Sequence, residues 1–290
     1  MKQTAGVLLA ASLAAVAAGP TSRPGGAIRS RFLIVDNGAA RLVCVDQREP
    51  SKGWSVAIPA GSRDLERLDA NTVLVSHGSG AGEYALADGR KLWSASSYRG
   101  ISSARRLPNG NTLLAGAGKG VTLYEVARDG KEVRRTELPG TSDPRLIRLL
   151  GNGHVLVAMA GPHRIVEVDA AGRTVWQAAL PGKGYVAERQ PDGTTLATVG
   201  GECLVLRLGK DGKPVATLGG KDKHPAARLQ WFSGMHVLSG GDIVVADWLG
   251  HGKAGQGPHV VRFSPDNRIV WQWEDHQAVK TATNVLVLGE

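Results

Sequence analysis

The 290-residue chain has few of the residues that would build a disulfide framework, a cysteine-rich metal centre or a membrane span. Its two cysteines, Cys44 and Cys203, exclude a disulfide network and a Cys-rich zinc site. Beyond residue 18, no apolar run reaches the roughly 20 residues that a spanning helix needs. Hydrophobic residues still make up 42% and charged residues 21%, so the chain can bury a large core and is not disordered throughout.

The amino-terminal residues predict an exported protein. Lys2 is followed by an apolar stretch over residues 5–18 that ends in small residues, which is typical of a secretory signal peptide. We expect residues 1–18 to be this signal peptide, cleaved near Ala17 or Ala18, and residues 19–30 to be a short lead-in. No cysteine lies near the cleavage point, so a lipoprotein is not expected. The predicted location is the periplasm or the extracellular space, without a membrane span.

A repeat of about 40 residues organises the rest of the chain. Six β-like runs, spaced 40 to 47 residues apart, begin near Leu33, Val73, Leu113, Leu156, Leu196 and Ile243. Each is followed by a second alternating run and then by a turn such as Asp88-Gly89, whose glycine suits a tight hairpin. Four short strands in each repeat are typical of a propeller blade. Residues 31–290 are therefore predicted to form one all-β domain, a six-bladed β-propeller.

Two further features support a closed ring of blades. Tryptophan occupies a corresponding place in four repeats, as Trp54, Trp93, Trp176 and Trp271, which predicts packing between adjacent repeats. The first repeat has no room for an innermost strand, and residues 283–288 (TNVLVL) look like that missing strand. We therefore expect the C-terminal strand to complete the first blade, which would remove exposed sheet edges.

Two segments carry a resemblance to a known superfamily. Residues 84–93 (YALADGRKLW) and 168–176 (VDAAGRTVW) are similar to repeats of the quinoprotein, or PQQ-like, β-propellers. Residues 231–252 resemble the last blade of secreted bacterial six-bladed members. The resemblance covers nearly all of the mature chain and implies the fold, but propellers of this type serve many functions.

Three classes of function suit such a propeller. We favour a binding or scaffold module, without catalysis or cofactor, for a protein, glycan or small molecule at the channel face. The second class is an arylsulfotransferase-like enzyme, a distant resemblance that implies a histidine on the channel face to accept the sulfuryl group. The third, a quinone-dependent dehydrogenase, is the least favoured. Characterised members have eight blades and a disulfide of adjacent cysteines, whereas Cys44 and Cys203 lie in separate repeats.

The candidate ligand-binding residues form two groups. The first surrounds a glycine-rich insertion in the sixth repeat, residues 249–259, and consists of Trp231, His236, Asp247, Trp248, His251 and His259. The second consists of Arg105, Arg148 and Arg189, near the ends of the first strands that line a propeller's channel. Because blade packing does not require the insertion, we predict that function lies on the face that carries it.

No metal is assigned and no nucleic acid is expected as a partner, although the sequence leaves open a metal at the loop of His251 and His259, with Asp247 nearby. His251 and His259 are eight residues apart, which matches no common metal-ligand spacing. The formal net charge of +9 comes from dispersed lysines and arginines, which favours weak attraction to acidic surfaces over nucleic-acid binding. The protein is expected to be a monomer.

Overall fold

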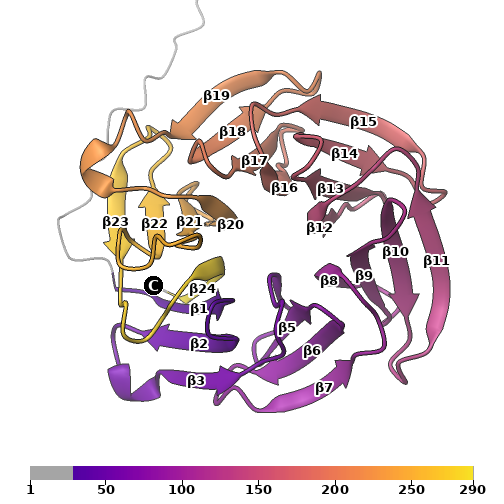
Figure 1. Cartoon of the computed structure of the whole chain (residues 1–290), viewed down its shortest axis with the longest axis horizontal. Coiled ribbons are helices and arrows are strands. Elements are labelled where there is room, and N and C mark those ends of the chain that lie inside the picture. The colour runs from indigo at the N-terminus through magenta and orange to yellow at the C-terminus, as the bar shows by residue number, and fades with distance from the viewer. Residues whose placement is uncertain (1–28, 290) are drawn as a thin grey trace, which may run out of the picture.

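A computed structural model describes residues 29–289 of the chain. The predicted signal peptide, its cleavage site and most of the lead-in lie outside the described residues. The described residues form six four-stranded antiparallel sheets arranged as the blades of a ring (Figure 1). The prediction of a six-bladed all-β propeller is confirmed. No helix within residues 29–289 is long and apolar enough to cross a membrane.

Each blade is one sheet, and its strands run in order from the axis of the ring to the rim. Blade 1 consists of β24 (Ala282–Gly289), β1 (Arg31–Asp36), β2 (Arg41–Asp46) and β3 (Trp54–Ala57). Blade 2 consists of β4 (Leu65–Arg67), β5 (Thr72–His77), β6 (Gly80–Ala85) and β7 (Lys91–Ala95). Blade 3 consists of β8 (Ile101–Arg106), β9 (Thr112–Ala117), β10 (Val121–Val126) and β11 (Glu132–Leu138). Blade 4 consists of β12 (Pro144–Leu149), β13 (Val155–Met159), β14 (Arg164–Val168) and β15 (Thr174–Ala179). Blade 5 consists of β16 (Gly184–Arg189), β17 (Thr195–Val199), β18 (Leu204–Leu208) and β19 (Pro214–Gly219). Blade 6 consists of β20 (Phe232–Val237), β21 (Ile243–Asp247), β22 (Val260–Phe263) and β23 (Ile269–Trp273). Two short 3-10 helices, η1 (Pro50–Lys52) and η2 (Pro225–Ala227), lie in connections.

The ring closes through pairing between the two ends of the chain. Strand β24 pairs with β1, with Leu286 opposite Leu33. At the end of β1, the carboxylate of Asp36 accepts the backbone N–H groups of Lys280 (2.8 Å) and Thr281 (2.9 Å), which precede β24. The prediction that the C-terminal strand completes the first blade is confirmed.

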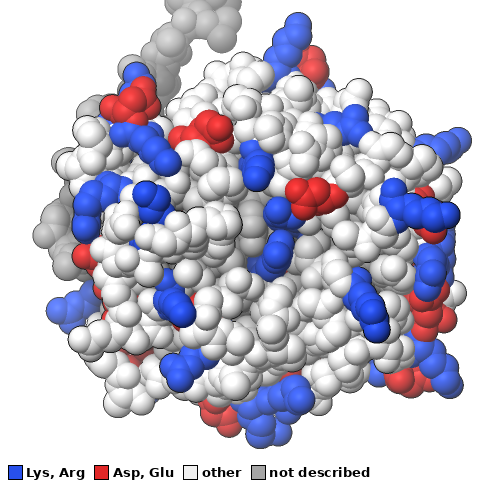
Figure 2. All heavy atoms as spheres, in the orientation of Figure 1, with Lys and Arg blue, Asp and Glu red and all other residues white. Residues whose placement is uncertain are grey.

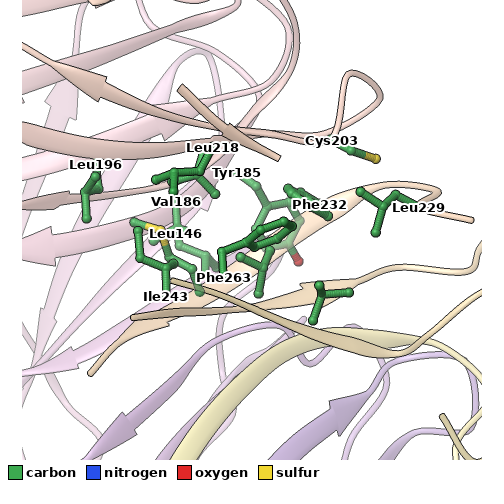
Figure 3. Packing of buried hydrophobic residues seen from close by; sticks show 14 residues of the cluster. Leu146, Tyr185, Val186, Leu196, Cys203, Leu218, Leu229, Phe232, Ile243 and Phe263 are labelled. Carbon is green, nitrogen blue, oxygen red and sulfur yellow. The ribbon is translucent and has the colours of Figure 1, made fainter. Parts of the chain in front are cut away.

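The burial of the strands explains their sequence patterns. Strand β13 (VLVAM) lies between neighbouring blades with every residue buried, and its sequence is continuously apolar. Strand β15 (TVWQAA), at the rim, alternates in exposure because one of its faces meets solvent. Figure 3 shows the packing between blades, where Phe232 and Phe263 lie close to Tyr185 and Val186 of the preceding blade.

The repeated tryptophans join four of the blades to the blade that follows. The indole Nε1 groups of Trp54, Trp93 and Trp176 donate to backbone carbonyls of the following blade, those of Leu86 (3.2 Å), Arg128 (2.7 Å) and Lys210 (2.8 Å). Trp271 instead packs edge-on against Phe32 of blade 1, with ring centroids 5.5 Å apart. The predicted packing between adjacent repeats is confirmed.

Candidate functional site

One residue from every innermost strand occupies the same register position around the axis of the ring. These six residues, which we call the axial ring, are Leu286, Glu66, Arg105, Arg148, Glu188 and His236, in blade order. Their partners on the second strand are likewise equivalent: Leu33, Leu74, Leu113, Leu156, Leu196 and Val244. A polar or charged side chain thus points towards the axis from five of six blades.

The axial ring lines a cavity of about 230 Å³, which we call the axial cavity. Its remaining lining residues are largely apolar: Leu65, Leu149, Met235 and Val285, together with Asn284 and Arg67. In Figure 2, basic side chains with an acidic neighbour lie near the middle of the face shown, while most other charged groups lie towards the rim. The inner strands therefore concentrate charge at the axis of an otherwise apolar core.

A fully buried carboxylate anchors the arginines of the axial ring. Asp64 Oδ1 accepts from Arg105 Nη2 at 2.7 Å, from Arg148 Nη1 at 3.3 Å and from the amide of Asn284 at 3.3 Å. Its second oxygen accepts from the hydroxyl of Ser103. Since the side chain of Asp64 is 0% exposed, it serves as the counter-ion of this cluster and is not a group that a ligand reaches.

Four groups of the axial ring keep hydrogen-bonding capacity towards the cavity. One is Glu188, which accepts from Arg148 Nε at 3.2 Å with one oxygen, while no described residue donates to the other. His236 Nδ1 accepts the backbone N–H of Val287 at 3.0 Å, which places the proton on Nε2 and makes that nitrogen a donor. Burial lowers the pKa of His236, which favours the neutral form of the ring. Arg148 bonds through Nε and Nη1, while Nη2 has no partner among the described residues. Glu66 accepts the N–H of Arg106 with one oxygen, and no described residue donates to the other.

Arg189, the third predicted channel arginine, does not face the cavity. Its guanidinium donates to Glu167 Oε2 at 2.6 Å and lies over the ring of Trp176 at 4.8 Å. Arg106 repeats this arrangement two blades earlier, with Glu83 and Trp93. Arg189, in blade 5, therefore connects its own blade to blade 4.

The structure separates His236 from the other candidates of the sixth blade. In the pairing of β20 with β21, Phe232 lies opposite Asp247, whereas His236 lies opposite Val244. His236 is thus four residues, or about 13 Å, along the strand from the end that carries the insertion. The structure therefore does not bring His236 to the insertion, although the sequence groups it with Trp231 there. His236 joins the axial ring, and Trp231 lies beside the insertion.

Buried Asp247 and His259 fix the base of the insertion. Asp247 accepts the backbone N–H groups of Gln230 (3.0 Å) and Trp231 (2.6 Å), so it caps the start of β20. His259 is 0% exposed, and its Nδ1 accepts the N–H of Asp275 at 3.3 Å. Burial lowers the pKa of His259 to about 4. These contacts indicate a structural role for both residues.

The aromatic candidates near the insertion form a small surface cluster. Trp248 meets Trp231 edge-to-face at 6.1 Å and His251 at 4.9 Å between ring centroids. Lys183 lies 5.7 Å from the Trp231 ring. Of the three aromatic residues only His251 is exposed, and the insertion is held where Gln230 donates to the carbonyl of Gln256.

The stability of the protein should depend on pH through Asp247. Burial raises the pKa of Asp247 to about 7 from 3.8, while the N–H groups of Trp231 and Gln230 and the charge of Lys221 offset only part of this effect. Between about pH 4 and 7 the folded state keeps a proton that the unfolded state has released, so stability falls as the pH rises. We expect the free energy of unfolding of the wild type, minus that of D247N, to fall from about pH 4 to 7 and to level off above pH 7.

Urea unfolding of both proteins at several pH values measures this difference. The titration of His259 has the opposite sign, since its folded-state pKa is lowered, but it is present in both proteins and cancels. A difference that stays constant from pH 4 to 7 would show that Asp247 is ionised throughout.

A second cavity, of about 310 Å³, lies off the axis between blades 1 and 2. It shares Arg67 with the axial cavity but is lined by these two blades alone. Its carboxylate Asp46 already accepts the N–H groups of Arg48 and Glu49 and lies 3.6 Å from Arg31. The axial cavity is therefore the stronger candidate site, because all six blades converge on it.

Sequence reasoning missed Glu66 and Glu188, and a signal for them exists. In blades 2 to 6, a turn follows the innermost strand and is closed by the backbone N–H of one residue, such as Leu68 or Leu150. The axial-ring residue always stands two positions before it, as Glu66 does before Leu68 and Arg148 before Leu150. Aligning the repeats on these turns therefore identifies the axial-ring residues of blades 2 to 6. No group of three or more His, Cys, Asp or Glu suited to a metal occurs in the described part of the chain.

The comparisons with known proteins agree with this architecture. The family model described as outer membrane protein assembly factor BamB matches residues 9–145 and, in an overlapping register, residues 80–219. These matches cover more than half of the sequence, and the chain belongs to this family of PQQ-like β-propellers. A search of curated proteins finds no match.

Solved structures share the fold at low sequence identity. A protein of unknown function from Bacteroides caccae has a TM-score of 0.77 at 20% identity, over 91% of this chain and 100% of its own. Virginiamycin B lyase from Staphylococcus aureus has a TM-score of 0.56 at 15% identity, over 84% of this chain and 80% of its own. At such identities the similarity establishes the fold alone.

The residues present do not fit the quinone cofactor of the superfamily. The axial cavity is smaller than the roughly 300–1,000 Å³ of typical cofactor sites, and two carboxylates, Glu66 and Glu188, line it. Cys44 and Cys203 are free and buried in different blades, and burial raises the pKa of both thiols, that of Cys203 to about 12. The quinone-dependent dehydrogenase therefore finds no support in this site.

The axial cavity also lacks the nucleophile of a sulfuryl-transfer enzyme. A histidine that accepts a sulfuryl group must present the lone pair of a ring nitrogen. The lone pair of His236 accepts the N–H of Val287, and the nitrogen on the other side of the ring carries the proton. His236 is therefore placed to donate a hydrogen bond.

Proposed function

We propose that the protein is a binding module without catalysis, and that the axial cavity holds its ligand. The observation that carries this proposal is the axial ring itself, in which all six inner strands place a side chain at one level around the axis. A ring closed by pairing of both chain ends holds these side chains rigidly, which favours recognition of a defined small group.

The supply of free polar groups supports binding at this cavity. Arg148 Nη2, His236 Nε2–H and one oxygen each of Glu66 and Glu188 line the cavity without partners from the described chain. These side chains are half-buried, so the free atoms are open to a polar ligand or ordered water in the cavity. A volume of about 230 Å³ equals that of roughly eight water molecules, which favours a small molecule or a single side chain.

Nuclear magnetic resonance with a panel of small compounds tests this assignment. We would titrate ¹⁵N-labelled protein with small carboxylic acids, amines, amino acids and monosaccharides. Binding at the proposed site shifts backbone amides of the axial ring, those of Glu66, Arg148 and His236 among them. Shifts confined to residues 248–256 would move the site to the insertion, and a panel without any shift would contradict a small-molecule module.

We also propose that the chain is exported to the periplasm. The family is associated with that compartment, and the sequence of residues 1–18 has the pattern of a signal peptide. Mass spectrometry of protein purified from the cell envelope should find a chain that begins close to residue 18. Soluble protein that retains Met1 would contradict this proposal.

A further inference from the structure

We propose that the axial cavity binds a free α-amino acid with a small apolar side chain. The inference rests on the proposed function and adds the chemical class of the ligand. It follows from the positions of the free groups, which come from blades 2, 4, 5 and 6 and therefore surround much of the cavity.

Two of the free groups are hydrogen-bond donors suited to a carboxylate. Arg148 Nη2 carries charge, and the guanidinium is held by the carbonyl of Ile147 at 2.8 Å and by Glu188 at 3.2 Å. His236 Nε2–H is fixed as a donor by the backbone N–H of Val287. Charge-assisted bonds of this kind are stronger than neutral ones, so a carboxylate is the preferred group on this side.

The other free groups, on Glu66 and Glu188, are acceptors suited to an ammonium group. Glu66 is half-buried and receives a single hydrogen bond from the protein, the N–H of Arg106 at 2.7 Å. Burial raises its pKa, so the charged form needs a partner that the chain does not fully supply. A ligand ammonium at the open oxygen of Glu66 would provide that partner.

The charges around the cavity favour a ligand without net charge. Three arginines, Arg67, Arg105 and Arg148, are balanced by the carboxylates of Glu66, Glu188 and the underlying Asp64. A phosphate or a dicarboxylate would add uncompensated charge to a partly buried site, whereas a zwitterion brings both signs. The apolar wall then selects a small aliphatic side chain.

Calorimetry with three nearly isosteric compounds tests the proposal on the unaltered protein. The probes are L-valine, 2-hydroxy-3-methylbutanoate, which lacks the ammonium group, and L-valinamide, which lacks the carboxylate. We expect L-valine to bind about tenfold or more tightly than either analogue, because each analogue loses one charged hydrogen bond. Equal binding of the hydroxy acid would identify a carboxylate site, equal binding of the amide would identify an amine site, and either result would overturn the proposal.

The variant E66Q assigns the ammonium site. It keeps the shape and the acceptor for Arg106 but removes the charge, so L-valine and the hydroxy acid should bind this variant about equally. H251A, on the opposite face, is the matched control and should keep the preference of the wild type. If L-valine fails to bind while another compound shifts the amides of the axial ring, the ligand class is wrong and the proposed function stands. A preference that E66Q retains would place the ammonium elsewhere.

Discussion

A chain that ends at Thr281 should not form a stable ring. Strand β24 buries Val285, Leu286 and Val287 against blade 1 and its neighbours, and these side chains together contribute about 5–9 kcal/mol. That amount is comparable with the whole stability of a domain, about 5–15 kcal/mol. Its loss also exposes the inner edge of β1 and opens the axial cavity, so we expect no cooperative unfolding transition at 25 °C.

Circular dichroism and tryptophan fluorescence during urea unfolding measure this loss. V215T is a suitable control, because Val215 lies on the rim strand β19 and is 62% exposed. Its effect should remain within about 0.5 kcal/mol. A truncated chain that unfolds at the urea concentration of the parent would show that pairing of the two chain ends does not stabilise the ring.

The second large effect is expected at Asp64. Replacing it by Asn leaves Arg105 and Arg148 without the buried carboxylate that both contact, and Arg105 is only 6% exposed. Breaking a buried ion pair from one side costs about 3–5 kcal/mol, since the remaining charge is left uncompensated. We expect D64N to lower the free energy of unfolding by an amount in this range.

D143N is the matched control for D64N. Asp143 also pairs with an arginine, Arg145, but it is 43% exposed, and such surface pairs contribute at most about 1 kcal/mol. Urea unfolding at neutral pH compares the two variants. If D64N loses no more stability than D143N, the buried carboxylate does not hold the arginines of the axial ring together.

The sequence predicts the fold closely because one pattern recurs six times. The runs expected near Leu113 and Ile243 correspond to β9 (Thr112–Ala117) and β21 (Ile243–Asp247). The expected C-terminal strand, residues 283–288, is β24 (Ala282–Gly289). Alternating burial and glycine turns determine these elements locally, and the missing inner strand of the first repeat determines how the ring closes.

The sequence predicts the site only in part because side-chain direction depends on strand register. Arg148 and Arg189 both stand near the end of an inner strand, but Arg189 is one position later in the register and points between blades. Glu188, its neighbour, takes the position equivalent to Arg148. Spacing alone likewise does not show that Trp231, just before β20, and His236, near its end, lie towards opposite faces of the ring.

A crystal structure of the protein grown with saturating L-valine is the decisive test of ligand binding at the axis. We expect the ligand in the axial cavity, with its carboxylate about 2.7–3.2 Å from Arg148 Nη2 and His236 Nε2, and its ammonium at a similar distance from Glu66. A ligand bound against Trp231 and Trp248 at the other end of the inner strands would contradict this expectation. Electron density for water alone in the axial cavity, at saturating L-valine, would also contradict this expectation.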